Sequence, residues 1–389
     1  MSVNFSSIKS ITIPEGNVME ITDSAGRVMW VKSSEPAPSG EIYGVEWDYS
    51  QPSTKLTRLE NAASFSDPAP AKSLTAVGSS PFDSIMPWAG MKKYNIIDSV
   101  VTYSEDDAGF DMTAYDTMVY IPPFYYKAEK DTANSKWRWY ISPEAQEGFT
   151  LHPGSGRYIG RYHTSTSYTS VSGATPISNI TRATGRTESH AKGDNWWQMD
   201  FATWCAVELL YLTEFADWYS QSVLGTGQDN NTKTLYSGLT DSAAYHTVKL
   251  SNTSHQYRNI ENPYSNLFTW CDGFVASSRA VYAGLDNGTF GDTTTNLNAT
   301  GITLPQTNGC IAGYGYCEEY PWAFIPDTVN GTDYTMYVSD RVISGLYERT
   351  LSVGGSYATY ANYGFFCAYS NLQSEGKFMD IGSRLIFIP

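Results

Sequence analysis

One segment of this chain carries large apolar side chains at helical spacing, and it restricts where a helix can form. From about residue 196 to residue 222 these side chains recur every three or four positions, and Gly225 and Gly227 follow as a helix-ending signal. The sequence therefore predicts one helix over 196–222. Glu208 falls inside its apolar stripe, and there we favour an ion pair with an arginine over a catalytic role. From residue 226 onward the pattern changes to short strands and long loops rich in Gly, Asn and Thr.

The first 40 residues differ in character from the rest. Residues 1–32 alternate apolar and polar side chains and carry turn signals at 14–17 and 23–26, which predicts a small module of strands. A module of this size is marginal alone, so we expect it to attach to another chain or to oligomerise. Residues 33–40 form a Pro/Ser linker. We expect a β-rich intermediate region at 41–150, with strands at 118–121 and 136–141, and a third region at 151–389.

Charge and hydropathy exclude two classes of partner. The chain has 25 Lys and Arg against 40 Asp and Glu, a net charge of −15. Phosphate backbones are bound by concentrated positive charge, so we expect no nucleic-acid partner. No run of 18 apolar residues occurs, and the N-terminal residues lack the basic and apolar pattern of a signal peptide. We expect no membrane insertion.

The residues that usually carry catalysis are scattered. The histidines stand alone, with no pair at helical spacing, so a zinc site is not expected. Asp106-Asp107 and Glu318-Glu319 could serve as paired carboxylates for glycoside cleavage, but we favour solvated loops for both. We therefore expect no catalytic residues and no metal site. Five cysteines are too few and scattered for a disulfide framework, and we expect all of them to be reduced and buried: Cys205, Cys271, Cys310, Cys317 and Cys367.

Aromatic content is the most unusual part of the composition. The chain holds 29 Tyr, 11 Trp and 16 Phe, and only 17% of its residues are charged. A surface rich in Tyr, Ser, Thr and Asn is typical of recognition surfaces. A β-rich fold that uses Tyr and Thr in its strands explains the same composition. Composition alone leaves both interpretations open.

Three segments in order resemble the formylglycine-generating-enzyme-like branch of the C-type lectin fold. WQMDFATWC at 197–205, followed by LTE at 212–214, is similar to the family's helix motif. YRNIENPYSNLFTWCDG at 257–273 is similar to its G-N-V-W-E-W segment, and GGSY at 354–357 with IGSRL at 381–385 is similar to its C-terminal ending. The resemblance implies an α+β class, with a C-type-lectin-like ligand-binding domain at 151–389 preceded by small β modules.

The enzymatic chemistry of that family is not retained in these residues. Its two catalytic cysteines correspond to Gly364 and Tyr369, and Cys367 fits neither position. Because the reaction needs a thiolate, we expect no oxidase activity. The family's calcium segment keeps Asn262 but has Thr269 in place of its Glu, which removes a charged ligand for a hard cation. We favour no cofactor, with calcium as the less favoured alternative, and we expect Asn262 to stabilise a turn.

The non-enzymatic branch, which includes the variable proteins of diversity-generating retroelements and the phage major tropism determinants, is the more similar. In it, the face between the Gly-Gly-Ser-Tyr element and the last strand binds the ligand. The equivalent stretch here has no charged residue from Tyr357 through Ser374. The resemblance implies ligand binding by its polar and aromatic side chains: Tyr357, Thr359, Tyr360, Asn362, Tyr363, Tyr369 and Asn371. We expect Phe365, Phe366 and Leu372 in the core. Whether a retroelement diversifies this stretch stays open.

The N-terminal module and the YGVEWD element at 43–48 also resemble structural proteins from phages and prophages of Gram-positive gut bacteria. Together the resemblances imply a phage or prophage tail-tip receptor-binding protein. It would bind a bacterial surface glycan or protein non-covalently, join a tail or baseplate protein through its N-terminus, form a homotrimer, and reside in the virion. Two alternatives stay open, a tail-associated glycan hydrolase and a purely structural tail protein.

Overall fold

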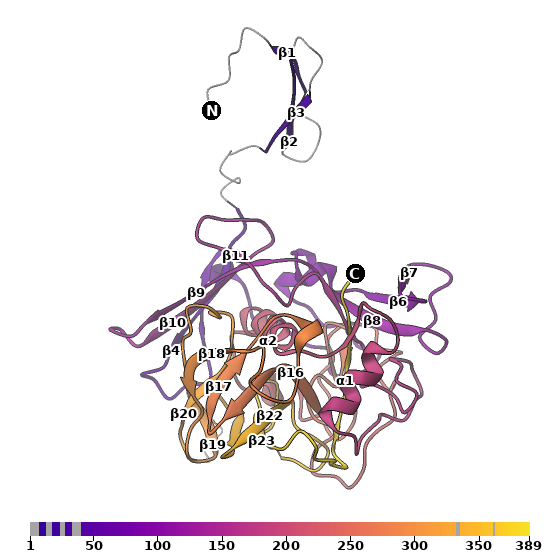
Figure 1. The fold of residues 1–389 in the computed structure, drawn as a ribbon, viewed down its shortest axis with the longest axis vertical. Helices are drawn as coiled ribbons and strands as arrows, with labels where there is room; N and C mark the ends of the chain where they lie inside the picture. Colours follow the sequence, from indigo (N-terminus) through magenta and orange to yellow (C-terminus); the bar gives the residue numbers. More distant parts are fainter. Residues whose placement is uncertain (1–7, 13–17, 24–27, 33–39, 332–334, 361) are drawn as a thin grey trace. The chain divides into compact units, whose positions relative to one another are not determined.

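The computed structural model describes residues 8–12, 18–23, 28–32, 40–331, 335–360 and 362–389 (Figure 1). The chain divides into two compact units, Met1–Gly40 and Glu41–Pro389. In the first unit, three strands form an antiparallel sheet in the order β1-β2-β3, with bounds Ile8–Thr12, Val18–Asp23 and Val28–Lys32. The linker predicted at 33–40 lies outside the described residues except for Gly40. The boundary predicted between 150 and 151 falls inside the second unit.

Two sheets of the second unit are built mainly from residues 43–160. The five-stranded sheet has the order β11-β9-β10-β4-β5, with bounds Thr150–Leu151, Tyr125–Asp131, Lys136–Ser142, Tyr43–Asp48 and Thr57–Glu60. The six-stranded sheet has the order β13-β25-β12-β8-β6-β7, with bounds Trp196–Gln198, Leu385–Phe387, Arg157–Gly160, Asp116–Ile121, Lys93–Ile97 and Val100–Ser104. The strands predicted at 118–121 and 136–141 are confirmed as parts of β8 and β10.

The largest sheet is built from the C-terminal half of the chain. Its path runs β18-β17-β16-β22-β23-β21-β19-β20, with bounds Asn298–Thr303, Ala280–Ala283, Phe268–Ser277, Glu348–Val353, Ala368–Leu372, Arg341–Ser344, Gly309–Tyr314 and Pro326–Val329. β24 (Ile381–Gly382) pairs with β16 as the ninth strand. β14 (Gln256–Tyr257) and β15 (Ile260–Glu261) form a separate small hairpin, which precedes β16 in the sequence. β23 pairs antiparallel with β22 and parallel with β21, so it lies inside the sheet and not at an edge.

The helices are few and short among the described residues. They are α1 (Arg182–His190), α2 (Phe201–Phe215), α3 (Ser220–Leu224) and the single turns η2 (Asn61–Ser64), η3 (Pro81–Ser84), η4 (Trp88–Gly90) and η5 (Asn287–Thr289). The helix predicted over 196–222 is thus shorter than expected. Asp200 caps its start by accepting the N–H of Thr203 at 2.7 Å, and Ala216 ends it in the left-handed conformation.

The predicted α+β class is wrong. Strands hold 33% of the described residues and helices hold 12%, so the architecture is mainly β. The reason lies in α2, whose fifteen residues are all buried. It packs against β4, β10 and β16, so it fills the space between sheets and does not form a helical layer (Figure 1). None of the helices in the described ranges combines the length and apolar character needed to cross a bilayer.

One core joins the sheets of the second unit. It contains Trp47 and Trp139 from the five-stranded sheet, Trp204 of α2, and Phe365 and Phe366 from the C-terminal segment. A smaller apolar cluster lies around Phe268, Trp270 and Leu372. The core assignment of Phe365, Phe366 and Leu372 is therefore confirmed, with exposed fractions of 0%, 2% and 6%.

Candidate functional site

The stretch that leads into β23 begins with a turn that only glycine satisfies. Gly354 and Gly355 have φ angles of +87° and +70°, in the left-handed region that L side chains rarely adopt. A Cβ on Gly355 would also stand 2.4 Å from the carbonyl oxygen of Tyr363. The two glycines therefore fold the chain back on itself, and Tyr357 and Tyr363 are brought to the same region of the surface.

A buried carboxylate fixes the middle of this stretch. Asp340 accepts the backbone N–H of Gly364 at 2.6 Å and that of Phe366 at 2.8 Å, and it is fully buried. Ser220 of α3 accepts the N–H of Phe365 at 3.0 Å through its hydroxyl. Burial raises the pKa of Asp340 to about 7, although the two backbone hydrogen bonds act in the opposite direction. The backbone N–H groups of three consecutive residues, 364 to 366, are thus all hydrogen-bonded to buried side chains.

Neighbouring loops hold the exposed part of the stretch by its backbone. Asn230 and Asn231 donate their backbone N–H groups to the carbonyl oxygens of Thr359 (2.8 Å) and Tyr357 (2.6 Å). Tyr357 in turn donates its own N–H to the carbonyl oxygen of Asn266 at 3.0 Å. The segment is therefore fixed on both sides by loops that are distant in sequence.

Three of the predicted residues gather around one phenylalanine and one aspartate. The ring of Phe268 lies 6.1 Å from that of Tyr363 and 5.4 Å from that of Tyr369, edge-on in both cases. Burial raises the pKa of Tyr357 and of Tyr369, and the negative charge of Asp380 raises both further. These three tyrosines, with Phe268 and Asp380, are named the tyrosine face.

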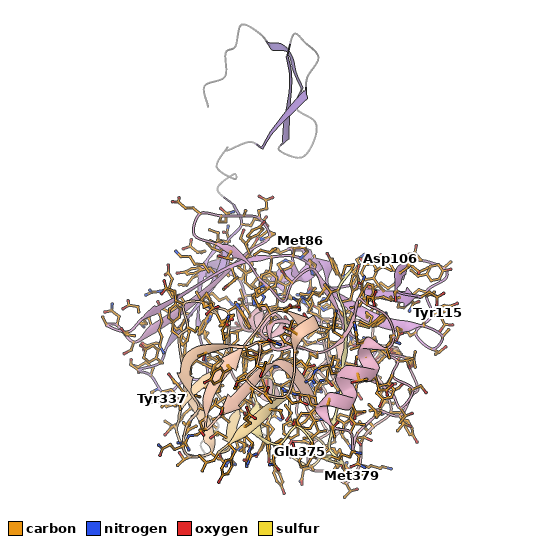
Figure 2. All side chains as sticks on the ribbon, in the orientation of Figure 1. Met86, Asp106, Tyr115, Tyr337, Glu375 and Met379 are labelled. Atoms are coloured by element: carbon orange, nitrogen blue, oxygen red, sulfur yellow. The ribbon has the colours of Figure 1, made fainter. Side chains whose placement is uncertain are left out.

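Cations and exposed side chains surround the tyrosine face. The guanidinium carbon of Arg341 lies 5.9 Å from the centre of the Tyr363 ring. Tyr360 is 62% exposed. Its backbone carbonyl accepts the N–H of Tyr363 at 3.2 Å, which links the two residues through the main chain. Figure 2 shows Met379 and Glu375, which both precede Asp380 in the sequence, at the lower edge of this unit.

The remaining predicted residues have other surroundings. The hydroxyl of Thr359 donates to the carbonyl oxygen of Ser356 at 2.7 Å and accepts its N–H at 2.9 Å, so it shapes the turn. Asn362 is partly exposed, and its carbonyl oxygen accepts the N–H of Arg341 at 3.0 Å. Asn371 is exposed near the far end of β23, where its side chain lies against Gly345. The structure brings Tyr357, Tyr360, Tyr363 and Tyr369 together and leaves Asn371 apart.

Sequence reasoning missed four residues that build this site. Phe268 and Asp380 complete the face, Arg341 lies over Tyr363, and Asp340 holds the backbone. They come from β16, from the segment before β24, and from the start of β21. No local pattern marks them, because each becomes functional only when strands distant in sequence pair.

The groups considered for catalysis are poorly placed for it. All five cysteines are free and buried, as predicted. Burial raises the pKa of Cys205, Cys271 and Cys367, which disfavours the thiolate. The acidic pairs lie on exposed loops, as favoured from the sequence. Asp106 pairs with Lys92 at 2.7 Å, and Glu319 accepts a hydrogen bond from Asn298 at 2.8 Å.

The ion pair predicted for Glu208 is wrong. Its Oε2 atom is buried without a hydrogen-bond partner, and burial raises its pKa well above the usual value, so it is held neutral. On the same helix, an arginine does pair with Glu214, six residues further along α2. Arg258 donates to Glu214 at 2.5 Å and 3.0 Å, and both side chains are buried.

Asn262, which corresponds to a calcium ligand in the resembling family, makes local hydrogen bonds in a turn. Asn262 has a φ of +44°, accepts the N–H of His255 at 3.2 Å and donates to the hydroxyl of Ser254 at 3.0 Å. Thr269 is buried in β16. Within the described ranges, no group of three or more His, Cys, Asp and Glu is arranged to hold a metal ion.

Comparisons with known proteins give limited information. No family model matches the chain. A search of curated proteins also finds no match. The C-type-lectin-like part of the resemblance therefore gains no support from them. The solved structures similar to this chain include two phage tropism proteins. The Major Tropism Determinant P3c variant has 11% identity and a TM-score of 0.28 over 100% of this chain and 85% of that chain. The M1 variant has 12% identity and a TM-score of 0.26 over 100% of this chain and 84% of that chain.

Proposed function

We propose that this chain is a receptor-binding protein of a phage or prophage tail, and that its tyrosine face, extended by Tyr360 and Asn362, binds a bacterial surface ligand non-covalently. The ligand is a glycan or a protein. The observation that carries the proposal is the packing of Tyr363 and Tyr369 against Phe268, with Tyr357 and Tyr369 near Asp380, on a stretch fixed by backbone hydrogen bonds.

Tyrosine suits this task for a physical reason. Its ring offers a large contact area with only two rotatable side-chain bonds, so little conformational entropy is lost on binding. The hydroxyl provides a hydrogen bond at the edge of that contact. The face is also held in place before binding, because Asp340 and the loop at 230–231 fix the backbone. A fixed surface loses less entropy when it meets its ligand than a mobile loop does.

The first unit provides the other end of the proposed function. Its three strands form a sheet too small to be stable by itself, so a partner would complete it. We assign residues 1–32 to attachment on a tail or baseplate protein in the virion. Assembly as a homotrimer would present three faces and raise a weak single-site affinity through avidity. Light scattering on the full chain tests this assembly, and a monomer would remove the avidity argument.

The decisive experiment compares binding of the full chain to a panel of candidate bacterial cells. The test variant is Tyr360→Ala combined with Tyr363→Ala, because the Tyr363 ring belongs to the face and the exposed Tyr360 is hydrogen-bonded to Tyr363 through its backbone. The control is Tyr115→Ala, which removes a half-buried tyrosine that Figure 2 places at a different edge. Thermal unfolding of each variant establishes that the fold is retained.

The proposal expects wild type and Tyr115→Ala to bind the same cells, and the double variant to lose binding with an unchanged melting temperature. Equal binding by all three proteins would place the ligand elsewhere on the molecule. If wild type binds no cell, the purely structural role becomes the better interpretation.

A further inference from the structure

A second recess lies where the five-stranded sheet meets the outer strands of the largest sheet. It has a volume of about 530 Å³, within the range of about 300–1,000 Å³ common for small-molecule sites. One wall comes from the ends of β4, β9 and β10, and the other from β19 and β20. Its partly exposed lining includes Tyr49, Lys130, Asp327, Asn330 and Tyr337. We call it the β9–β20 groove.

Lys130 ties the two walls of the groove together. Its ammonium donates a hydrogen bond to the carbonyl oxygen of Tyr314 on β19 and lies 4.5 Å from the centre of the Trp137 ring. The carboxylate of Asp327 acts on the same ammonium from β20. The groove therefore carries one charge of each sign at short range and has little net attraction for a strongly charged ligand.

Aromatic rings form the base and side of the groove. Trp137 stacks on Trp139 with ring centres 5.0 Å apart and planes 13° apart, which fixes its orientation. The Tyr49 ring lies 5.8 Å from that of Trp47 and is partly exposed, so a ligand can reach it. Tyr337, labelled in Figure 2, adds a second partly exposed ring from the opposite wall.

Hydrogen-bonding side chains lie along the same groove. Asn330 contributes an amide and Thr132 a hydroxyl, in addition to the carboxylate of Asp327 and the ammonium of Lys130. The groove therefore combines aromatic rings with hydrogen-bond donors and acceptors, as small-molecule sites commonly do.

We infer that the β9–β20 groove binds a short, uncharged oligosaccharide. A sugar ring presents apolar C–H groups on its face and hydroxyls around its rim. The Tyr49 ring matches the face, while Asp327, Asn330 and Lys130 match the rim. A wholly apolar ligand would remove these polar groups from water without replacing their hydrogen bonds, which disfavours its binding. The inference does not depend on the tyrosine face, because none of the residues that define that face lines the groove.

The test is a titration of the full chain with three neutral probes, chitotetraose, cellotetraose and maltotetraose, followed by tryptophan fluorescence and by calorimetry. We expect saturable binding of at least one probe. Tyr49→Ala and Asn330→Ala should each weaken it by about tenfold, and Tyr115→Ala should leave it unchanged. Lys130 is not substituted in the first round, because its removal would also separate the walls.

Two results would overturn the inference. One is the absence of saturable binding by all three probes at millimolar concentration. The other is equal binding by wild type, Tyr49→Ala and Asn330→Ala when their melting temperatures agree. Neither result bears on the proposed function of the tyrosine face, because cell binding by the Tyr360→Ala/Tyr363→Ala variant is measured separately. If the double variant still binds cells as well as wild type does, while the oligosaccharide probes bind as expected, the proposed function of the tyrosine face is refuted and the inference about the groove stands.

Discussion

The carboxylate of Asp340 lies directly beneath the backbone of Gly364 and accepts its N–H at 2.6 Å. Asp340 immediately precedes β21, and Gly364 lies four residues before β23, which pairs with β21 in parallel. This contact joins the buried part of the largest sheet to the stretch that carries the exposed tyrosines. Stability of the fold and shape of the face are therefore coupled at this point.

Asp340→Asn tests that coupling through pH. Burial raises the pKa of Asp340 from 3.8 to about 7, so the folded protein keeps a proton that the unfolded chain releases between those values. The contribution of Asp340 to stability therefore falls as pH rises through this window, by up to about 1.4 kcal/mol per pH unit. Asparagine does not titrate. Urea unfolding should show the stability advantage of wild type over Asp340→Asn shrinking from about pH 4 to 7. An advantage that grows with pH would contradict the assignment.

Gly364→Ala should distort the same region. A Cβ there would stand 2.3 Å from the hydroxyl oxygen of Ser220 and 2.8 Å from a carboxylate oxygen of Asp340, so the stretch must shift. We expect a loss of about 1–3 kcal/mol, typical of overpacking, together with weaker cell binding. Gly291→Ala is the matched control, because a Cβ at Gly291 meets nothing within 4 Å. Thermal unfolding of both variants checks the prediction, and equal melting temperatures would refute it.

Glu214→Gln should be among the most destabilising single changes in the second unit. Glu214 is the buried partner of Arg258, and its loss leaves a buried guanidinium with only Asp83, at 3.0 Å, as a charged partner. We expect a loss of about 3 kcal/mol in chemical denaturation. The contrasting change is Asp106→Asn, which breaks an exposed pair with Lys92 and should cost less than about 0.5 kcal/mol. A similar loss of unfolding free energy in the two variants would show that burial does not determine how much an ion pair contributes to stability.

Glu208→Gln should not destabilise the protein at neutral pH. Since burial raises the pKa of Glu208 well above its usual value of 4.5, the side chain is neutral in the folded protein, and glutamine has nearly the same shape. By urea unfolding near pH 4.5 we expect the two proteins to differ by less than about 1 kcal/mol. At pH 7 the variant should already be the more stable protein, because folded wild type keeps a proton that the unfolded chain releases above pH 4.5, whereas glutamine does not titrate. A large loss at pH 7 would indicate a charged, paired Glu208.

Strand positions with clear local patterns were predictable, and long-range pairings were not. Residues 118–121 and 136–141 alternate or cluster apolar side chains, and both form strands. Trp196–Gln198 carries the same apolar character as the helix that follows. It forms a strand instead, which pairs with β25 near the C-terminus. The apolar stripe therefore predicted a helix that began too early, and the fold class was wrong because the sheets assemble from distant segments.

The candidate site shows the same division. The run from Tyr357 to Asn371 was identified by its lack of charge and its tyrosines, which are local properties. Asp340 and Phe268 were missed, since a buried aspartate and one phenylalanine among many carry no local signal. Glu208 was assigned an ion pair with an unspecified arginine, but it is Glu214 that pairs with one, because both glutamates lie on α2 and the sequence does not show which of them faces Arg258.

The hydrogen bonds that fix the tyrosine face have a consequence for evolution. Asn230 and Asn231 hold carbonyl oxygens of the stretch, Asp340 holds its N–H groups, and Arg341 donates to the carbonyl of Asn362. All of these contacts use main-chain atoms of the stretch, which every residue type except proline provides. The exposed side chains at Tyr360 and Asn362 can therefore be exchanged without loss of the supports that shape the surface, so new specificities can arise while the scaffold stays the same.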